Sequence, residues 1–129
     1  MTTIDRAVDI ARQTITWHAY GAEVTGEQVA RHLEAARARI AEVGWHPSGM
    51  TTSLFGQLTA AAERGRGTAS TRFVAGLVIT SVLRARTGAR LASHEVWERE
   101  TGRTPEDVQQ LLLDAAAVAR DAGPKGASR

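Results

Sequence analysis

Histidine and carboxylate side chains are the groups with which this chain could hold a metal ion, because the sequence contains no cysteine. His94 and Glu98 stand four residues apart, a spacing that places an imidazole and a carboxylate on one face of a helix. A working metal site also needs a third ligand and outer hydrogen-bond partners, and no neighbouring segment supplies them. We therefore predict no metal and no cofactor, and we interpret this segment as a solvated helix face beside Trp97.

The other histidines, His18, His32 and His46, are isolated from one another and form no recognisable nucleophilic or acid–base motif in the sequence. The sequence also lacks the GxSxG nucleophile elbow, the GxxxxGK phosphate loop and the GxGxxG dinucleotide motif. We therefore predict that the protein is not an enzyme. A site assembled in space from distant histidine and carboxylate residues is the second alternative, since catalytic triads are built in that way.

A basic stretch in the middle of the chain makes nucleic acid a candidate partner. It carries six arginines and no acidic residue: Arg64, Arg66, Arg72, Arg84, Arg86 and Arg90. Residues 57–78 can be fitted to a helix-turn-helix with Gly65 in the turn, which would place Thr68, Ser70 and Thr71 near phosphates or base edges. The second helix of that unit is very apolar for a groove, and arginines also suit a helix C-terminus because the helix dipole favours cations there. DNA binding is therefore the first alternative function.

The distribution of charge and apolar residues favours a protein partner. Acidic residues outnumber basic ones between residues 95 and 121, whereas the middle of the chain is basic. Several alanine- and leucine-rich stripes offer more apolar surface than one small core can hide. We predict a protein-interaction module that binds another chain or itself, with a homodimer as the natural outcome.

Length and composition set the fold class. A chain of 129 residues with abundant alanine and only 5% aromatic residues predicts one all-α domain, a compact orthogonal bundle of five to six short helices. Residues 1–123 should form this domain and residues 124–129 a frayed tail. The net charge of +2 is too small to drive binding to nucleic acid or membranes by itself. We find no secretory signal and no membrane-spanning run, and we expect a cytoplasmic protein.

The clearest helix is expected between Thr25 and Trp45. Thr25 and Gln28 form a capping box, and Gly44 suits the left-handed position after the last turn, so that Trp45 folds back onto Ile40. Its apolar stripe consists of Val29, Leu33, Ala36, Ile40 and Val43. Such a stripe needs a partner, and the rest of the bundle must supply it.

The other helices are expected at residues 4–17, 53–64, 71–86 and 93–101, with a short connection at residues 18–24. The segment 71–86 is rich in β-branched residues, which favours a strand, but its length and its apolar side favour a buried helix, which we predict. Phe55 and Phe73 are expected in the core. The last helix should begin with Thr104 as its cap and Pro105 at its first position.

Three segments together resemble a family of uncharacterised small helical proteins encoded in actinobacterial genomes, plasmids and phages. They are HLEAARARIAEVGW, SLFGQLTAAA and VWERETGRTPEDVQQLLLDAAAVAR, and the resemblance spans roughly residues 32–120. An arginine-dominated basic content, with Lys125 as the single lysine, is typical of such high-GC genomes. Ser53 stands near the place of a cysteine in that family, which argues against a thiol role here. The resemblance implies a compact helical fold and no established activity.

Overall fold

Six helices make up most of the chain in a computed structural model that describes residues 1–88 and 93–126. They are α1 (Thr3–Thr14), α2 (Gly26–Val43), α3 (Leu54–Glu63), α4 (Ala69–Thr87), α5 (His94–Glu98) and α6 (Pro105–Ala122). A short antiparallel hairpin, β1 (His18–Ala19) with β2 (Ala22–Glu23), connects α1 to α2. The predicted all-α fold is confirmed.

Threonine caps fix where the longer helices begin. A reciprocal capping box starts four of them, with the pairs Thr2–Asp5, Thr25–Gln28, Thr68–Thr71 and Thr104–Asp107. In each box the threonine side chain accepts a bond from the third helical amide, and that residue's side chain accepts one from the cap amide. The caps predicted at Thr25 and Thr104 are confirmed, as is Pro105 at the first position of α6.

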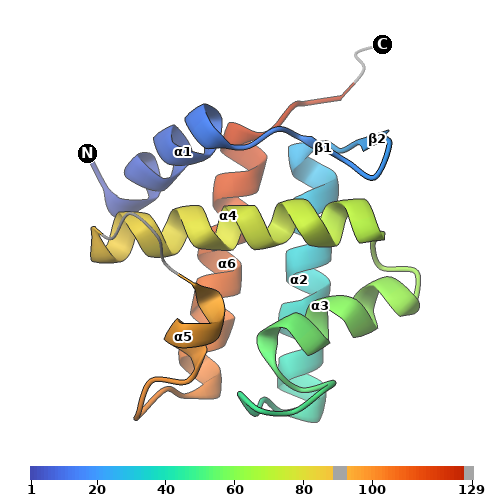
Figure 1. Ribbon diagram of the computed structural model, residues 1–129, viewed down its shortest axis with the longest axis vertical. Coiled ribbons are helices and arrows are strands. Elements are labelled where there is room, and N and C mark those ends of the chain that lie inside the picture. The colour runs from blue at the N-terminus through green and yellow to red at the C-terminus, as the bar shows by residue number, and fades with distance from the viewer. Residues whose placement is uncertain (89–92, 127–129) are drawn as a thin grey trace.

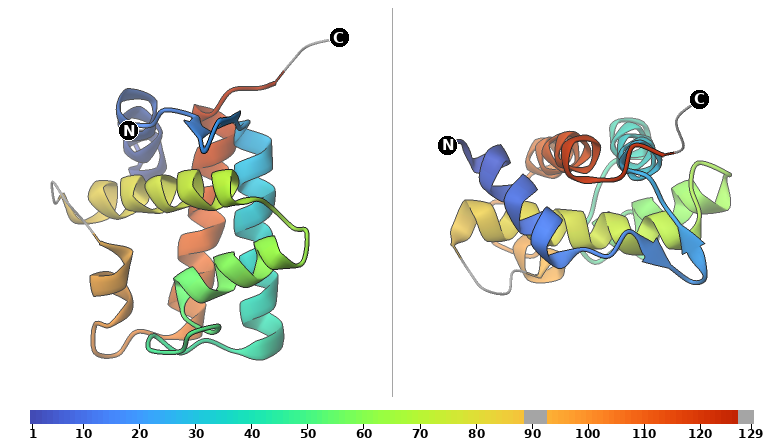
Figure 2. Two further views of the ribbon diagram at one scale, coloured as in Figure 1. Left: turned by 45° about the vertical axis from the view of Figure 1, so that its right-hand side comes forward. Right: turned by 90° about the horizontal axis from the view of Figure 1, so that it is seen from above.

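The helices form two layers (Figures 1 and 2). Helices α2 and α6 lie side by side in one layer and make the most extensive contact of any two elements. Helix α4 runs crosswise in front of both of them, with α1 and the hairpin on one side of it and α3 and α5 on the other. This crosswise helix agrees with the predicted orthogonal arrangement. Because α4 contacts α1, α2, α3, α5 and α6, it holds the bundle together.

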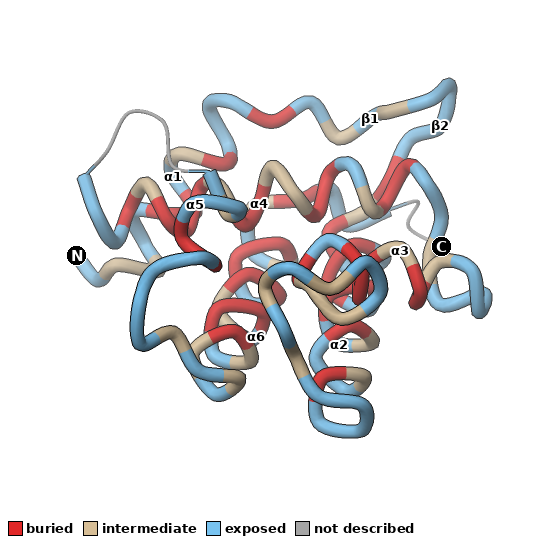
Figure 3. The backbone as a smooth tube through the Cα atoms, turned by 60° about the horizontal axis from the view of Figure 1, so that its bottom comes forward, coloured by how far each residue is buried: buried red, intermediate tan, exposed pale blue. Residues whose placement is uncertain are grey.

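The core lies where α4 crosses α2 and α6 (Figure 3). Its large, fully buried side chains include Leu33, Leu58, Ile79, Leu83 and Leu111. Helix α4 contributes more buried residues than any other described element, and most of its β-branched side chains are among them. The ambiguous segment 71–86 is therefore helical, as predicted.

Three apolar side chains predicted to be buried are exposed. Phe55 and Phe73 have exposed fractions of 52% and 49%, and Val43, at the end of α2, has 44%. The prediction was wrong for the phenylalanines because the bundle covers only one side of α3 and α4, whereas their apolar residues extend around the helix. The expected core position of Phe73 is taken by Val74 and Ala75, which are fully buried.

The first helix ends three residues before its predicted end. Ile15 has an extended conformation, with φ −98° and ψ 129°, and the chain then enters the hairpin rather than the unstructured connection expected at residues 18–24. The turn of the hairpin is formed by Tyr20 and Gly21, both at positive φ (52° and 77°), the conformation that a two-residue hairpin turn requires. Sequence rules missed it because tyrosine is an unusual residue in such a turn.

The C-terminal segment starts against α2. The carbonyl of Pro124 accepts a hydrogen bond of 2.9 Å from the amide of Gly26, and the Lys125 ammonium donates to the Arg120 carbonyl. Residues 127–129 of the predicted tail lie outside the described residues. Residues 124–126 are exposed, and their described contacts are local to the ends of α2 and α6.

Candidate functional site

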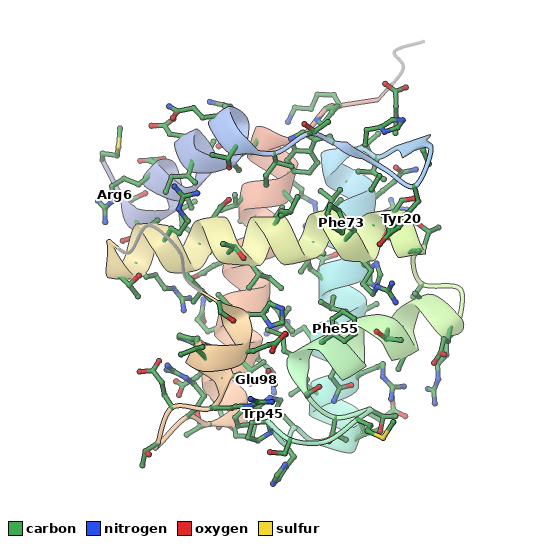
Figure 4. All side chains as sticks on the ribbon, in the orientation of Figure 1. Arg6, Tyr20, Trp45, Phe55, Phe73 and Glu98 are labelled. Atoms are coloured by element: carbon green, nitrogen blue, oxygen red, sulfur yellow. The ribbon has the colours of Figure 1, made fainter. Side chains whose placement is uncertain are left out.

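Three exposed aromatic rings lie on the layer formed by α3, α4 and the hairpin (Figure 4), and an arginine of α4 lies over one of them. We call Tyr20, Phe55, Arg72 and Phe73 the aromatic face. Tyr20 has an exposed fraction of 70%, the highest of the three rings. Since the whole chain has only six aromatic residues, half of them lie on this one surface.

Contacts within the aromatic face fix the orientation of its side chains. The Tyr20 and Phe73 rings pack edge to face, with centroids 5.9 Å apart and planes at 78°. The Arg72 guanidinium carbon lies 5.3 Å from the centroid of the Phe55 ring, a cation–π distance. Arg72 and Phe73 are neighbours on α4, so their contacts connect Phe55 on α3 with Tyr20 in the hairpin. The result is one continuous surface that is preorganised rather than three separate exposed rings.

The backbone of Tyr20 has a strained conformation. Its φ of 52° is in the left-handed region, and it is the only non-glycine residue with positive φ in the described part of the chain. A side chain in this conformation costs roughly 1–2 kcal/mol, and the fold would avoid that cost with glycine or asparagine. The edge-to-face contact with Phe73 offsets about 0.5–1.5 kcal/mol of this conformational cost. Strain of this kind clusters at functional sites, which makes the position a candidate.

The structure does not bring together the five predicted arginines that it describes. Arg64 and Arg66 are exposed at the turn between α3 and α4, and Arg72 lies over Phe55. Arg84 and Arg86 lie near the other end of α4. Arg84 is twelve residues beyond Arg72, which corresponds to about 18 Å along the helix axis. Arg86 is paired with Asp114 on α6 at 2.6 Å. Arg90 lies outside the described residues.

Two of the three residues expected to contact DNA at the start of α4, Ser70 and Thr71, face inward. Ser70 is buried, and its hydroxyl donates to the Ala19 carbonyl at 2.8 Å. Thr71 is also buried, and its hydroxyl lies 2.7 Å from His32 Nδ1. Thr68 caps the helix. Ser70 and Thr71 therefore do not lie on the surface as the helix-turn-helix alternative requires, because the start of α4 is packed against the hairpin and α2, whereas Thr68 is exposed.

His32 is a packing residue and not an isolated surface histidine. Its Nε2 lies 2.8 Å from the Leu58 carbonyl, an acceptor, so the proton resides on Nε2 and Nδ1 is free to accept from Thr71. Burial lowers the pKa of His32 below its usual value, the Leu58 carbonyl opposes this shift, and the charge of Arg72 adds to it. Gly67, at φ 154°, passes so close to the ring that a Cβ there would overlap it. This neutral imidazole fixes the turn at residues 64–68.

Two buried polar side chains hold the loop between α2 and α3. The Glu98 carboxylate accepts hydrogen bonds from the Trp45 indole at 2.7 Å and from the Leu54 amide at 2.5 Å. The Gln57 amide donates to the Gly44 and Thr52 carbonyls at 2.8 and 3.3 Å. The Leu54 amide is the first of helix α3, so the carboxylate also meets the positive end of that helix.

The predicted structural residues at the ends of helices lie near these groups. Gly44 ends α2 with φ 84° and ψ 178°, so its φ is positive but its ψ lies outside the left-handed helical region that was predicted. Trp45 packs against the core and its indole donates to Glu98. Trp97 is buried, and Arg103 stacks on its ring at 3.8 Å while donating to its carbonyl at 3.0 Å. Arg103 thereby holds α5 against the start of α6.

The predicted pair His94–Glu98 does not form the solvated helix face expected from the sequence. Glu98 is 3% exposed and turned towards Trp45 and Leu54. No group of three or more histidine, cysteine, aspartate or glutamate side chains in the described residues is arranged to hold a metal ion. Burial of Glu98 could not be inferred from its own segment, since its partners lie 53 and 44 residues away.

An open groove of about 800 Å³ lies between the hairpin, α2 and the turn before α4. Its charged lining is mixed, with Glu23 and Glu34 beside Arg31 and Arg66, and its floor includes alanines of α2. Arg31 is paired with Glu27 at 2.9 Å, and Glu34 accepts from Arg120 at 2.7 Å. Because both signs alternate and two of the four groups are already paired, the groove has no strong preference for one charged ligand.

Comparison with known proteins defines the family. The profile of a family of unknown function (DUF6197) matches residues 24–118, which include everything from α2 to most of α6. The chain belongs to this family. No curated protein and no solved structure matches it significantly. The predicted membership of an uncharacterised family is thus confirmed, and α1 with the hairpin lies outside the matched part. In the described residues, no helix combines the length and apolarity needed to cross a membrane.

Proposed function

We propose that this member of the DUF6197 family is a non-enzymatic protein-interaction module that binds another protein chain through the aromatic face. The observation that carries the proposal is the strained, exposed Tyr20 ring at the head of a continuous aromatic and arginine surface. Tyrosine and arginine are enriched among the residues that dominate binding energy at protein interfaces. A rigid aromatic side chain also loses little conformational entropy on binding.

The fold itself supports this use of the surface. Phe55 and Phe73 could be replaced by polar residues without opening the core, because each is about half exposed. Apolar rings in water are unfavourable unless something covers them, and clustered ones are a mark of interaction sites. The chain therefore maintains a surface that gives the isolated monomer little stability.

A photo-cross-linking experiment in the cell of origin tests the proposal. A photoreactive phenylalanine analogue in place of Tyr20 should form a covalent adduct with a protein on illumination. The same analogue at Leu113 is the matched control, because this side chain is also exposed (41%) and apolar but lies on α6, in the other layer. Adducts at position 20 and none at position 113 support the proposal. No adduct at position 20, or equal adducts at both, contradicts it.

DNA binding is the second candidate, and one observation favours it. Arg64 and Arg66 are exposed at the same turn and form no ion pair with any residue that the structure describes. With Arg72 they would give three phosphate contacts at one end of α4. Fluorescence anisotropy with labelled duplex DNA tests this candidate. Replacement of all three by alanine should then weaken binding and flatten its salt dependence with unchanged helix content, whereas unchanged affinity would exclude the assignment.

A further inference from the structure

The exposed side of α4 carries a stripe of four residues with distinct chemistry. Phe73, Gly76, Thr80 and Arg84 follow one another at spacings of three and four residues, so they share one face of the helix. None of the four is buried. Figures 1 and 2 show that α4 crosses the front of the bundle with no other helix over this side. The stripe is aromatic at its start, small in its middle and cationic at its end.

No contact with the described residues requires glycine at position 76. It lies in the interior of a helix of 19 residues, where glycine is less favourable than alanine. A Cβ built on Gly76 would meet no atom within 4 Å, and its φ is not in the positive range that favours glycine. What glycine provides at such a position is room for a second backbone to approach the helix closely.

At the other end of the stripe, Arg84 forms no ion pair with any residue that the structure describes. Its Nε atom is buried and forms no hydrogen bond within the part of the chain that is described. Phe73 lies eleven residues earlier, about 16 Å along the helix. The Phe73 ring uses one edge contact with Tyr20 and is otherwise half exposed. The helix therefore presents an aromatic acceptor and an unpaired cation at a fixed separation.

We infer that a second copy of this chain covers the stripe, with the two α4 helices packed antiparallel about a two-fold axis. An axis that crosses α4 at the level between Val78 and Ile79 places Arg84 of each copy over Phe73 of the other. The same axis places Gly76 of one copy against the second helix near Thr80. In this antiparallel arrangement the cationic end of each stripe meets the aromatic end of the other. The stripe is therefore complementary to a second copy of itself, as an isologous dimer requires. This inference rests on the proposed function and names its partner.

The surroundings of α4 extend the contact. Helix α3 lies under the first half of α4 and α5 under its second half (Figure 1). The two-fold axis therefore brings α3 of one copy opposite α5 of the other, and each of these helices exposes an apolar side chain, Phe55 and Val96 respectively. Helix α4 alone is about 28 Å long, so the roughly 1,000 Å² or more that a specific interface needs requires these contacts from its neighbours as well.

Sedimentation equilibrium of the purified chain is the first test. The mass should rise with concentration from 13.8 kDa towards twice that value. Gly76→Ala is the decisive variant, because it should raise the thermal midpoint of the dissociated chain while it weakens association by about tenfold. A chain that stays at 13.8 kDa throughout the micromolar to millimolar range overturns the inference. So does a dimer that Gly76→Ala leaves unchanged.

A pair of charge variants tests the antiparallel arrangement. Phe73→Lys places a cation against Arg84 of the second copy, and Arg84→Glu removes the cation from Phe73, so each variant alone should sediment as a monomer. In an equimolar mixture, the cation of the Phe73→Lys copy meets the carboxylate of the Arg84→Glu copy, and the second contact is native, so association should return. Circular dichroism establishes that both variants keep the native helix content. A mixture that remains monomeric overturns the arrangement.

The outcomes for the inference and for the proposed function are separable. A purified chain that is monomeric, while position 20 cross-links to a different protein, overturns the second copy as partner and leaves the interaction module intact. A monomeric chain with no adduct at position 20 overturns both. An adduct whose two halves are both this chain supports both.

Discussion

Removal of the buried carboxylate of Glu98 should destabilise the fold far more than removal of a surface glutamate. In Glu98→Ala, the Trp45 indole and the Leu54 amide, at 2.7 and 2.5 Å from the carboxylate, both lose their acceptor. Each buried donor without a partner costs about 1–3 kcal/mol, so the free energy of unfolding should fall by about 4 kcal/mol. That is a large share of the roughly 5–15 kcal/mol by which domains of this size are stable.

Urea unfolding followed by far-ultraviolet circular dichroism measures this loss, with Glu95→Ala as the matched control. Glu95 lies on the same short helix but is exposed, so its replacement should change the free energy of unfolding by no more than about 0.5 kcal/mol. Trp45→Phe removes one of the two donors and should lower the free energy of unfolding of the otherwise native chain by about 1–3 kcal/mol. In the Glu98→Ala background it should cost less, because the hydrogen bond is already lost. A loss below about 1 kcal/mol in Glu98→Ala, or strictly additive effects, would refute the reasoning.

Three further changes probe the same interior. Trp45→Ala should lower the free energy of unfolding by about 3 kcal/mol in the same urea assay, and a loss near zero would mean that Trp45 does not pack on the core. Gly67→Ala should cost at least about 2 kcal/mol, because the new Cβ overlaps the His32 ring at a positive φ; a neutral effect would show that the turn can move away. Stability should also fall as pH drops below about 6.5, because the pKa of His32 is lower in the folded chain than in the unfolded one. Urea titrations at several pH values should show this slope in the native chain and a reduced slope in His32→Gln, and equal slopes would contradict the assignment.

Local sequence signals predicted where helices start, because a capping box depends on residues three positions apart. Thr25 with Gln28 and Thr104 with its partner could be read from the sequence and are confirmed. The box at Thr68 was missed because its second residue is a threonine and not the usual glutamate or glutamine. The hairpin was missed for a similar reason, since Tyr20 is not a typical residue for its turn.

The direction in which a helix faces could not be predicted where its apolar residues extend around it. Helix α4 is apolar on most sides, so periodicity alone gave no basis for placing Phe73 outside and Val74 inside. The burial of His32 and Glu98 could not be predicted either, because their hydrogen-bond partners lie 26–53 positions away in the sequence. The aromatic face combines both difficulties. Its residues come from three elements, and only their packing brings Tyr20, Phe55 and Phe73 onto one surface.

The most direct test of the central claim is a dilution series followed by nuclear magnetic resonance of the backbone amides. If the aromatic face is where this chain meets another copy, concentration-dependent shifts should be largest at Tyr20, Phe73 and Gly76 and absent at Leu113 on α6. Shifts that are absent at every concentration, or that map to α6 and not to the aromatic face, would contradict the account.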